Sequence, residues 1–300
     1  MASALRAAHA ASGALLKGRS AVVSGGTSGI GEGLALRLAS LGASVHILGR
    51  SAERGAEVLA QLRALNPEGS HGFSSVDAFS LPALTAFARG YVAQHASLDI
   101  LAMSQGMATL QGFTPTKEGL DQKLTLHFYG RMVLARELLP SLRRGTEPYV
   151  LSVLSAGVHS GIADWASDPA LQKSYSIKRA ADLAGFYNDL GLDALSRQEG
   201  NSGILFVHGA PGFVATRWGT EMPWAVRMLV RGLQFLGKSP ADCAEFMLRP
   251  IFRRGSRAAG GFELIGETGE LVQPTAQHTA AAREGVWAHT VAVLDGNGLR

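Results

Sequence analysis

The chain has 300 residues, of which 46% are hydrophobic and 17% are charged, so it can bury a large core. This composition excludes a disordered chain and a solvated coiled coil. The net charge of +4 is modest and the basic residues are dispersed, so no nucleic-acid partner is indicated. A single cysteine, Cys243, excludes an intramolecular disulfide framework and a cysteine-based zinc site, and it fits a reducing compartment.

No stretch reaches 18 uncharged apolar residues, so a membrane-spanning helix is not expected. Residues 1–18 are basic and contain no acid. They fit either an organelle-targeting leader or a flexible, alanine-rich N-terminus. We therefore expect a cytoplasmic protein, with delivery to an organelle as the alternative.

Apolar runs alternate with helical periodicity along most of the chain. Strands are predicted at 20–24, 44–48, 72–76, 98–103, 149–154, 203–208 and 262–265. Helices are predicted at 29–41, 52–65, 81–95, 119–142, 174–196 and 241–248. Since the strands are apolar on both faces and alternate with helices, the predicted fold class is α/β. We expect a Rossmann-type doubly wound parallel sheet of about seven strands, with helices on both faces.

No repeat or linker divides residues 19–295, which are predicted to form a single domain. An apolar segment at 211–240 follows the sixth strand, on the side of the sheet where such folds bind ligands. It is predicted to be a substrate lid, and the alternative is a packed surface helix.

A glycine-rich turn joins the first strand to the first helix, with the sequence Ser24-Gly25-Gly26-Thr27-Ser28-Gly29-Ile30-Gly31. Gly25 permits a tight turn, Gly29 lets the backbone approach a pyrophosphate, and Gly31 lets the helix pack on the strand. The free N–H groups of the helix N-terminus favour phosphate. We expect dinucleotide contacts from Gly25, Thr27, Ser28, Gly29, Ile30 and Gly31.

The end of the second strand indicates which dinucleotide is bound. An acid there would favour NAD, but the chain has Arg50 and Ser51, which can bind a 2′-phosphate. The predicted cofactor is therefore NADP(H). The alternative is that Arg50 is simply an exposed arginine in a turn.

The spacing G-x-x-x-G-x-G at this position resembles that of the short-chain dehydrogenase/reductase superfamily, and the closing segments resemble its retinol-dehydrogenase-like branch. The resemblance implies an oxidoreductase that transfers a hydride between nicotinamide and a carbonyl or alcohol. It also implies cofactor contacts from Asp77, from Gly106 in Met103-Ser104-Gln105-Gly106, and from Pro211, Gly212, Val214 and Thr216. Asp77 can equally be a plain turn residue.

Hydride transfer to a carbonyl needs a proton donor, and a tyrosine can serve if a nearby ammonium lowers its pKa. Tyr175 and Lys178 form such a pair at the start of the predicted helix 174–196. Ser155, after the fifth strand, can donate a hydrogen bond to the substrate oxygen. These three residues resemble the family's catalytic set, in which the tyrosine and lysine also contact the cofactor.

The catalytic region departs from the family pattern. The family spacing is Y-x-x-x-K, so aligning Lys178 puts Ser174 in the tyrosine position. Because an alcohol is far too weak an acid, Tyr175 is predicted to be the proton donor. His127 replaces the family's asparagine, and it either holds a water in a proton relay to Lys178 or is a buried structural histidine.

The sequence is also compatible with other functions. The main alternative is an NADP(H)-binding protein without turnover, acting in redox sensing or as a scaffold. Another is a membrane-surface lipid enzyme whose helix at 218–236 touches the bilayer, although peripheral membrane contact is not the favoured reading. The apolar lid suggests a small apolar carbonyl or alcohol substrate. The family resemblance also implies that the helices at 119–142 and 174–196 could pair in a homodimer. No metal-ligand motif is found.

Overall fold

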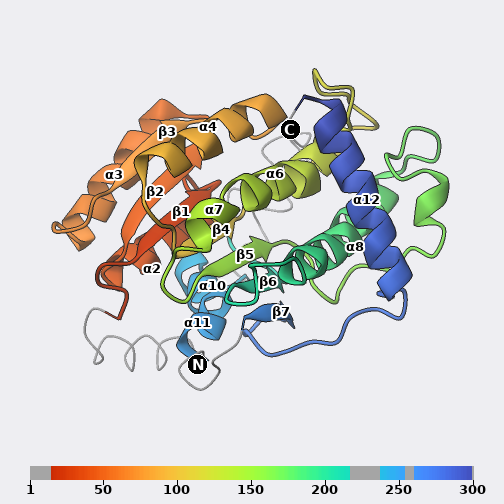
Figure 1. The fold of residues 1–300 in the computed structure, drawn as a ribbon. Coiled ribbons are helices and arrows are strands. Elements are labelled where there is room, and N and C mark those ends of the chain that lie inside the picture. Colours follow the sequence, from red (N-terminus) through yellow and green to blue (C-terminus); the bar gives the residue numbers. More distant parts are fainter. Residues whose placement is uncertain (1–14, 217–236, 254–259, 299–300) are drawn as a thin grey trace.

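The computed structural model describes residues 15–216, 237–253 and 260–298. A central sheet lies between two layers of helices (Figure 1). Its seven strands are parallel and follow the order β3-β2-β1-β4-β5-β6-β7. Their bounds are Ser20–Ser24 (β1), Ser44–Gly49 (β2), Gly72–Ser75 (β3), Ile100–Met103 (β4), Tyr149–Val153 (β5), Leu205–Gly209 (β6) and Gly261–Ile265 (β7). The predicted doubly wound α/β fold is confirmed.

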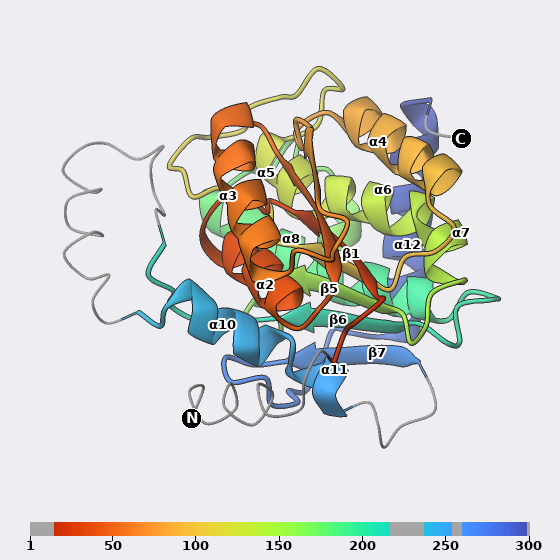
Figure 2. The same cartoon turned by 90° about the vertical axis from the view of Figure 1, so that its left-hand side faces the viewer.

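Each face of the sheet has its own apolar core, because alternate residues of a strand point to opposite faces. In β1, Val22 packs into one core, while Ala21 and Val23 pack into the other. Helices α4 (Leu81–Gln94), α6 (Gly130–Glu137), α8 (Ile177–Ser196) and α12 (Ala280–Gly296) cover the first face. Helices α2 (Gly29–Ser40), α3 (Ala52–Leu65) and α10 (Pro240–Met247) cover the second, as Figure 2 shows from the side.

Side-chain caps explain where several helices begin. Ser51, Ser80, Ser176, Ser239 and Thr279 each accept a backbone N–H from the first turn of the helix that follows. Such caps satisfy N–H groups that have no partner within the helix. The cap at Ser176 starts α8 at Ile177, three residues later than predicted. Consequently Tyr175 precedes the helix and does not lie on its first turn.

The predicted single helix at 119–142 is wrong. The chain forms a short α5 (Gln122–Leu124), a π-helical turn η1 (Thr125–Tyr129), α6 and a separate α7 (Leu139–Leu142). Asp121 caps α5, and Pro140 lies in the first turn of α7, where its missing N–H is tolerated. Helical periodicity could not reveal these breaks, because all four pieces bury apolar side chains.

The C-terminal helix α12 was not predicted, although Thr279 and the alanine-rich run after it are a start signal for a helix. The remaining short helices are η2 (Trp165–Ser167) and α11 (Arg249–Arg253). Within residues 1–18, predicted to be a leader or a flexible N-terminus, Leu16 is buried in the second core. Most of the proposed lid at 211–240 lies outside the described residues. Within the described ranges, no helix is long and apolar enough to cross a membrane.

Candidate active site

A pocket lies beyond the carboxyl ends of β1, β2, β3 and β4, where the strand order reverses between β1 and β4. Open α/β sheets bind ligands at such a switch point. The pocket brings together six of the residues predicted to contact the cofactor: Gly25, Thr27, Ser28, Arg50, Asp77 and Gly106.

Gly25 and Gly31 of the glycine-rich turn have no room for a side chain. A Cβ on Gly31 would lie 2.2 Å from the carbonyl oxygen of Gly25. Gly25 has a φ of 75°, in the left-handed region, and a Cβ there would lie 2.7 Å from the amide nitrogen of Gln105. The turn therefore holds β1, α2 and the end of β4 in close contact and exposes backbone at the pocket. This cradle fits a dinucleotide pyrophosphate.

The residues after β2 and β3 form the pocket's outer edge. Arg50 is exposed, and its guanidinium carbon lies 5.3 Å from the centre of the Phe79 ring. Ser51 caps α3, accepting the Arg54 N–H at 3.3 Å. Asp77 also accepts a backbone N–H, from Phe79. A cation and a helix N-terminus thus meet at one corner, an arrangement that fits a phosphate group.

The segment after β6 approaches the turn from the other side. A Cβ on Gly29 would meet the Thr216 side chain at 3.1 Å, so these two predicted contact residues are neighbours. Gly212 has a φ of 64°. Val214 is buried and pairs with Lys238 in an isolated bridge, while Pro211 precedes this turn. The predicted segment therefore returns to the glycine-rich turn, at Gly29.

Two hydroxyl groups in the predicted catalytic set are buried without a hydrogen-bond partner among the described residues. They are the Ser155 Oγ and the Tyr175 hydroxyl. The Phe113 ring packs edge-on against the Tyr175 ring, with centroids 5.9 Å apart. Burial, followed by the charge of Asp121, raises the pKa of Tyr175 to about 12. Both hydroxyls can donate a hydrogen bond to a ligand oxygen.

The expected pairing of Lys178 with Tyr175 is not present. The Lys178 side chain is 77% exposed, and its Nζ lies 2.5 Å from an Asp182 carboxylate oxygen and 3.3 Å from the Ser160 Oγ. Because α8 begins only at Ile177, the side chain of Lys178 points toward solvent and toward Asp182, which lies one turn farther along the helix. The expected lowering of the Tyr175 pKa is therefore wrong for this structure.

Another ammonium lies against Tyr175. The Nζ of Lys123 is 5.3 Å from the centre of the Tyr175 ring, and it donates to the carbonyl oxygens of Gln111 and Gly112 at 2.8 and 3.3 Å. Lys123 is only 6% exposed, and burial lowers its pKa despite the opposing charge of Asp121. Sequence reasoning missed it, since a lysine in a short helix gives no signal of its own.

Arg179 was also overlooked. It stands four residues after Tyr175, which is the interval the family pattern uses for its lysine. Its guanidinium pairs with Asp164 at 3.1 Å, and its Nε is buried without a hydrogen-bond partner among the residues that the structure describes. Counting four residues from Tyr175 would have found it.

The segment before Tyr175 is held by a single carboxylate. Asp168 accepts the backbone N–H groups of Gln172, Lys173 and Ser174 at 2.7 to 2.9 Å, as well as the Ser174 hydroxyl at 2.9 Å. These hydrogen bonds outweigh burial and lower the pKa of Asp168. The hydroxyl of Ser174, the residue in the aligned tyrosine position, is therefore hydrogen-bonded to Asp168.

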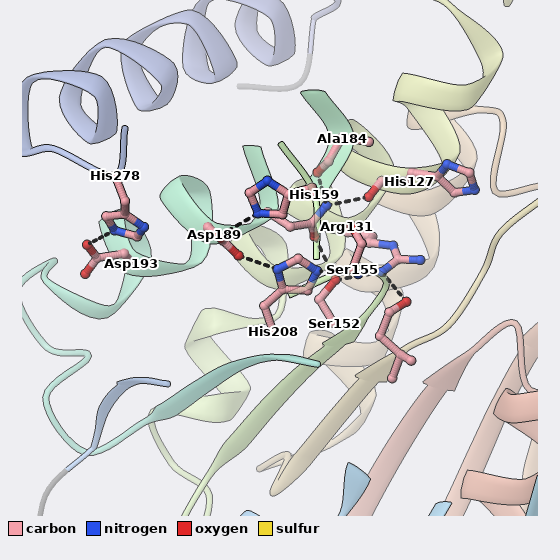
Figure 3. A network of polar contacts seen from close by, with 12 residues as sticks. His127, Arg131, Ser152, Ser155, His159, Ala184, Asp189, Asp193, His208 and His278 are labelled. Carbon is pink, nitrogen blue, oxygen red and sulfur yellow. Dashed lines mark hydrogen bonds and ion pairs between the residues drawn. The ribbon is translucent and has the colours of Figure 1, made fainter. Parts of the chain in front are cut away.

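His127 lies in the π-helical turn. Its Nε2 accepts the Met107 N–H at 3.0 Å, and burial, aided by the charges of Arg131 and Lys123, lowers its pKa to about 3. Its carbonyl oxygen accepts from the Asn188 amide at 2.7 Å (Figure 3). The ring thus has a structural contact, and the structure does not bring it to Lys178.

Sequence reasoning also missed Arg131 and Gln105. Arg131 is 1% exposed and donates to the Ser152 Oγ and to the carbonyl oxygens of Val153 and Gln105, all within 2.9 Å. It thereby joins the ends of β4 and β5 beneath the site. Gln105 lines the pocket with both side-chain amide atoms unpartnered among the described residues. No cluster of metal-ligating side chains occurs in the part of the chain that is described.

Residues 19–222 match the short chain dehydrogenase family, so the chain belongs to that family. It is 30% identical to polyprenol dehydrogenase of Mus musculus over 294 residues, which cover 94% of this chain and 85% of that protein. It is also 30% identical to human dehydrogenase/reductase SDR family member 13 over 271 residues, covering 89% and 71%. It is therefore an oxidoreductase-family protein near the retinol-dehydrogenase-like branch.

Solved structures support the fold. A Serratia marcescens short-chain dehydrogenase/reductase double mutant matches with a TM-score of 0.63 at 21% identity, covering 85% of this chain and 98% of that one. A metagenomic short-chain oxidoreductase in complex with NADP matches with a TM-score of 0.59 at 20% identity, covering 87% and 98%. At these identities the likeness establishes the shared fold.

Proposed function

We propose that the protein is an NADP(H)-dependent oxidoreductase that transfers a hydride between nicotinamide and an apolar carbonyl or alcohol. The observation that carries this proposal is the pair of buried, unpartnered hydroxyls of Ser155 and Tyr175. A buried polar group without a hydrogen bond costs about 1–3 kcal/mol, so such groups call for an explanation. A substrate oxygen would supply the missing partner for both.

Preference for NADP(H) over NAD(H) rests on Arg50 and Ser51. Arg50 is free to move its guanidinium off the Phe79 ring and to bind a 2′-phosphate, and Ser51 can donate its hydroxyl proton while its oxygen caps α3. Among the described residues that line the pocket, Asp77, at the end of β3, is the only acid. The NADP complex among the structures of the same fold agrees with this cofactor choice.

An apolar substrate is supported by the side chains around the carboxyl edge of the sheet. Most of the large hydrophobic residues that are exposed lie in segments that follow β4, β5, β6 or β7. They are Leu110, Phe113, Val158, Ile177, Phe213 and Leu271, with exposed fractions from 37 to 71%. Phe113 also contacts the Tyr175 ring. An apolar ligand would cover this surface.

The proposed mechanism assigns the chain three tasks. The bound cofactor supplies or accepts the hydride. Tyr175 donates the proton to the oxygen of a carbonyl substrate, and Ser155 donates a hydrogen bond to the same oxygen as negative charge develops on it. The ammonium of Lys123, against the ring face, would stabilise a phenolate on Tyr175.

A second candidate function is cofactor binding without turnover, in redox sensing or as a scaffold. Two observations favour it: the pKa of Tyr175 is raised, and the Lys178 ammonium pairs with Asp182 instead of the tyrosine hydroxyl.

A thermal-shift comparison of NADPH with NADH, followed by a panel of apolar aldehydes, ketones and alcohols, tests both candidates. Binding at 100 times the dissociation constant should stabilise the protein by about 2.7 kcal/mol. Turnover with NADPH is the expected result. Binding with no turnover of any substrate would favour the non-catalytic function, and no shift with either dinucleotide would overturn both.

A further inference from the structure

Behind Ser155, away from the cofactor pocket, one carboxylate joins two imidazoles. The Asp189 side chain, on α8, has one oxygen 2.5 Å from the Nδ1 of His208 and the other 2.8 Å from the Nε2 of His159. All three side chains are at most 1% exposed. Figure 3 shows Asp189 between the two rings, with His208 next to Ser155.

The proton positions on His208 follow from its neighbours. Its Nε2 lies 3.0 Å from the backbone nitrogen of Ser155, and an amide N–H can only donate. Nε2 therefore carries no proton, and the ring proton is on Nδ1, donated to Asp189. His208 is thus neutral, in agreement with burial lowering its pKa despite Asp189.

His159 is in the opposite state. Its Nε2 faces the Asp189 carboxylate and its Nδ1 faces the carbonyl oxygen of Ser160 at 3.3 Å, so both ring nitrogens meet acceptors. Both can donate, so these surroundings favour the imidazolium form of the ring. Burial opposes that charge, but the hydrogen bond and charge of Asp189, with a smaller contribution from Asp182, raise the pKa of His159.

Ser155 depends on this arrangement for its place in the site. Its hydroxyl has no hydrogen bond of its own within the described structure, so only its rotamer and its backbone direct it. Its backbone N–H is the group that His208 holds. The loop that carries Ser155 and His159 packs closely against α8 at Gly185. A Cβ on Gly185 would be 2.4 Å from the Ser155 Oγ and 2.8 Å from the His159 ring.

We propose that Asp189 is a positioning residue for Ser155: it fixes the tautomer of His208, which holds the Ser155 amide, while His159 supplies the compensating charge. The inference rests on the proposed function, because it takes Ser155 to be the hydrogen-bond donor to the substrate. It adds residues on α8 and β6 that no spacing in the sequence connects to Ser155.

The first test compares two buried aspartates one helical turn apart. Asp193 also binds a histidine, His278, at 2.9 Å, together with Arg197 and Arg283, but none of these partners is in the site. Asp189→Ala should lower kcat at least about tenfold with the NADPH dissociation constant unchanged, whereas Asp193→Ala should lower Tm and keep kcat. Equal kcat values in the two variants would overturn the proposal.

A second pair of variants covers the case in which Asp189→Ala does not fold. His208→Gln keeps an amide oxygen for the Ser155 N–H and an amide proton for Asp189, whereas His208→Leu keeps neither. We expect a large loss of kcat in His208→Leu that is mostly restored in His208→Gln. Two variants with equally low kcat at normal cofactor affinity would contradict the tautomer role.

Amide hydrogen exchange at Ser155 separates this inference from the proposed function, since it needs no substrate. Exchange at this amide should become faster in His208→Leu and remain protected in His208→Gln. If the wild-type protein turns over nothing, the proposed function fails, while the exchange result still decides whether His208 holds Ser155. Unchanged protection in His208→Leu would sink the positioning role.

Discussion

The glycine-rich turn and the segment around Tyr175 are built in different ways. In the turn, backbone atoms from β1, α2 and β4 are so close that a single Cβ at Gly31 would collide with Gly25. Around Tyr175, side chains from separate elements meet: Asp168 holds the preceding loop, Phe113 and Lys123 contact the ring, and Lys178 points away. A site made of backbone is defined by local spacing, whereas a site made of side chains is defined by tertiary contacts.

The largest effect is expected from a substitution at Tyr175, where the site is made of side chains. Tyr175→Phe removes the proposed proton donor while keeping the ring that packs against Phe113. We expect kcat to fall by about 10² to 10⁴-fold, as is typical of a general acid, with NADPH binding retained. Steady-state kinetics and a cofactor titration measure the two quantities. Ser174→Ala is the control, since that hydroxyl is bound to Asp168, and unimpaired turnover in Tyr175→Phe would remove the assignment.

The next largest effect is expected from a substitution in the glycine-rich turn. Gly31→Ala places a methyl group 2.2 Å from the Gly25 carbonyl oxygen, so the turn must open. We expect NADPH affinity to fall about a hundredfold, corresponding to about 2.7 kcal/mol. Gly90→Ala, in α4, is the matched control because none of the described residues outside its own helix comes within 4 Å of a Cβ there. Circular dichroism should show that both variants fold. Normal affinity in folded Gly31→Ala would mean that the cofactor binds elsewhere.

Arg50→Ala probes the corner of the pocket assigned to the 2′-phosphate. A charge-assisted hydrogen bond is worth about 1.5–3 kcal/mol, so NADPH affinity should fall at least about tenfold. NADH affinity should change little, because NADH has no phosphate at that position. Isothermal titration of both cofactors measures the ratio, and equal losses would move the phosphate contact to another residue.

Lys123→Met and Lys178→Met decide which ammonium serves Tyr175. Removing a cation from the ring face should raise the apparent pKa of the tyrosine, and each unit corresponds to about 1.4 kcal/mol. The pH–rate profile of Lys123→Met should therefore shift to higher pH, while that of Lys178→Met stays close to wild type. The reverse pattern would restore Lys178 to the catalytic role that the family resemblance implies.

The smallest expected effect concerns the pH dependence of stability. The pKa of His159 is higher in the folded protein than in the unfolded chain, so its charge stabilises the fold fully below about pH 6.5 and this contribution is lost as pH rises through the folded value. The titratable groups that face His159 are Asp189, Asp182 and His208. Arg131 in turn acts on His208. The free energy of unfolding should decline more from pH 6 to 9 in the wild type than in His159→Gln. Parallel curves would show that His159 is neutral.

This contrast explains what the sequence could predict. The seven strands, the turn at Gly25–Gly31 and its place at the switch point follow from local periodicity and from glycine's lack of a Cβ. The start of α8 could not be predicted to the residue, because it depends on whether Ser176 or an earlier serine caps the helix. That displacement of three residues changes where Tyr175 and Lys178 lie. Lys123 and the Asp189 cluster depend on contacts between distant parts of the chain, which spacing does not encode.

The π-helical turn at Thr125–Tyr129 contains one more residue than an α-helical turn would need, and its His127 carbonyl oxygen is bound by Asn188. In genetic terms, such a turn corresponds to a codon inserted into an ordinary helix. Removing one residue here would allow a regular α-helix but would rotate everything before it by about 100°. Asp121 and Lys123 would then leave Tyr175, so relatives whose helix lacks this extra residue should place a different side chain against their tyrosine.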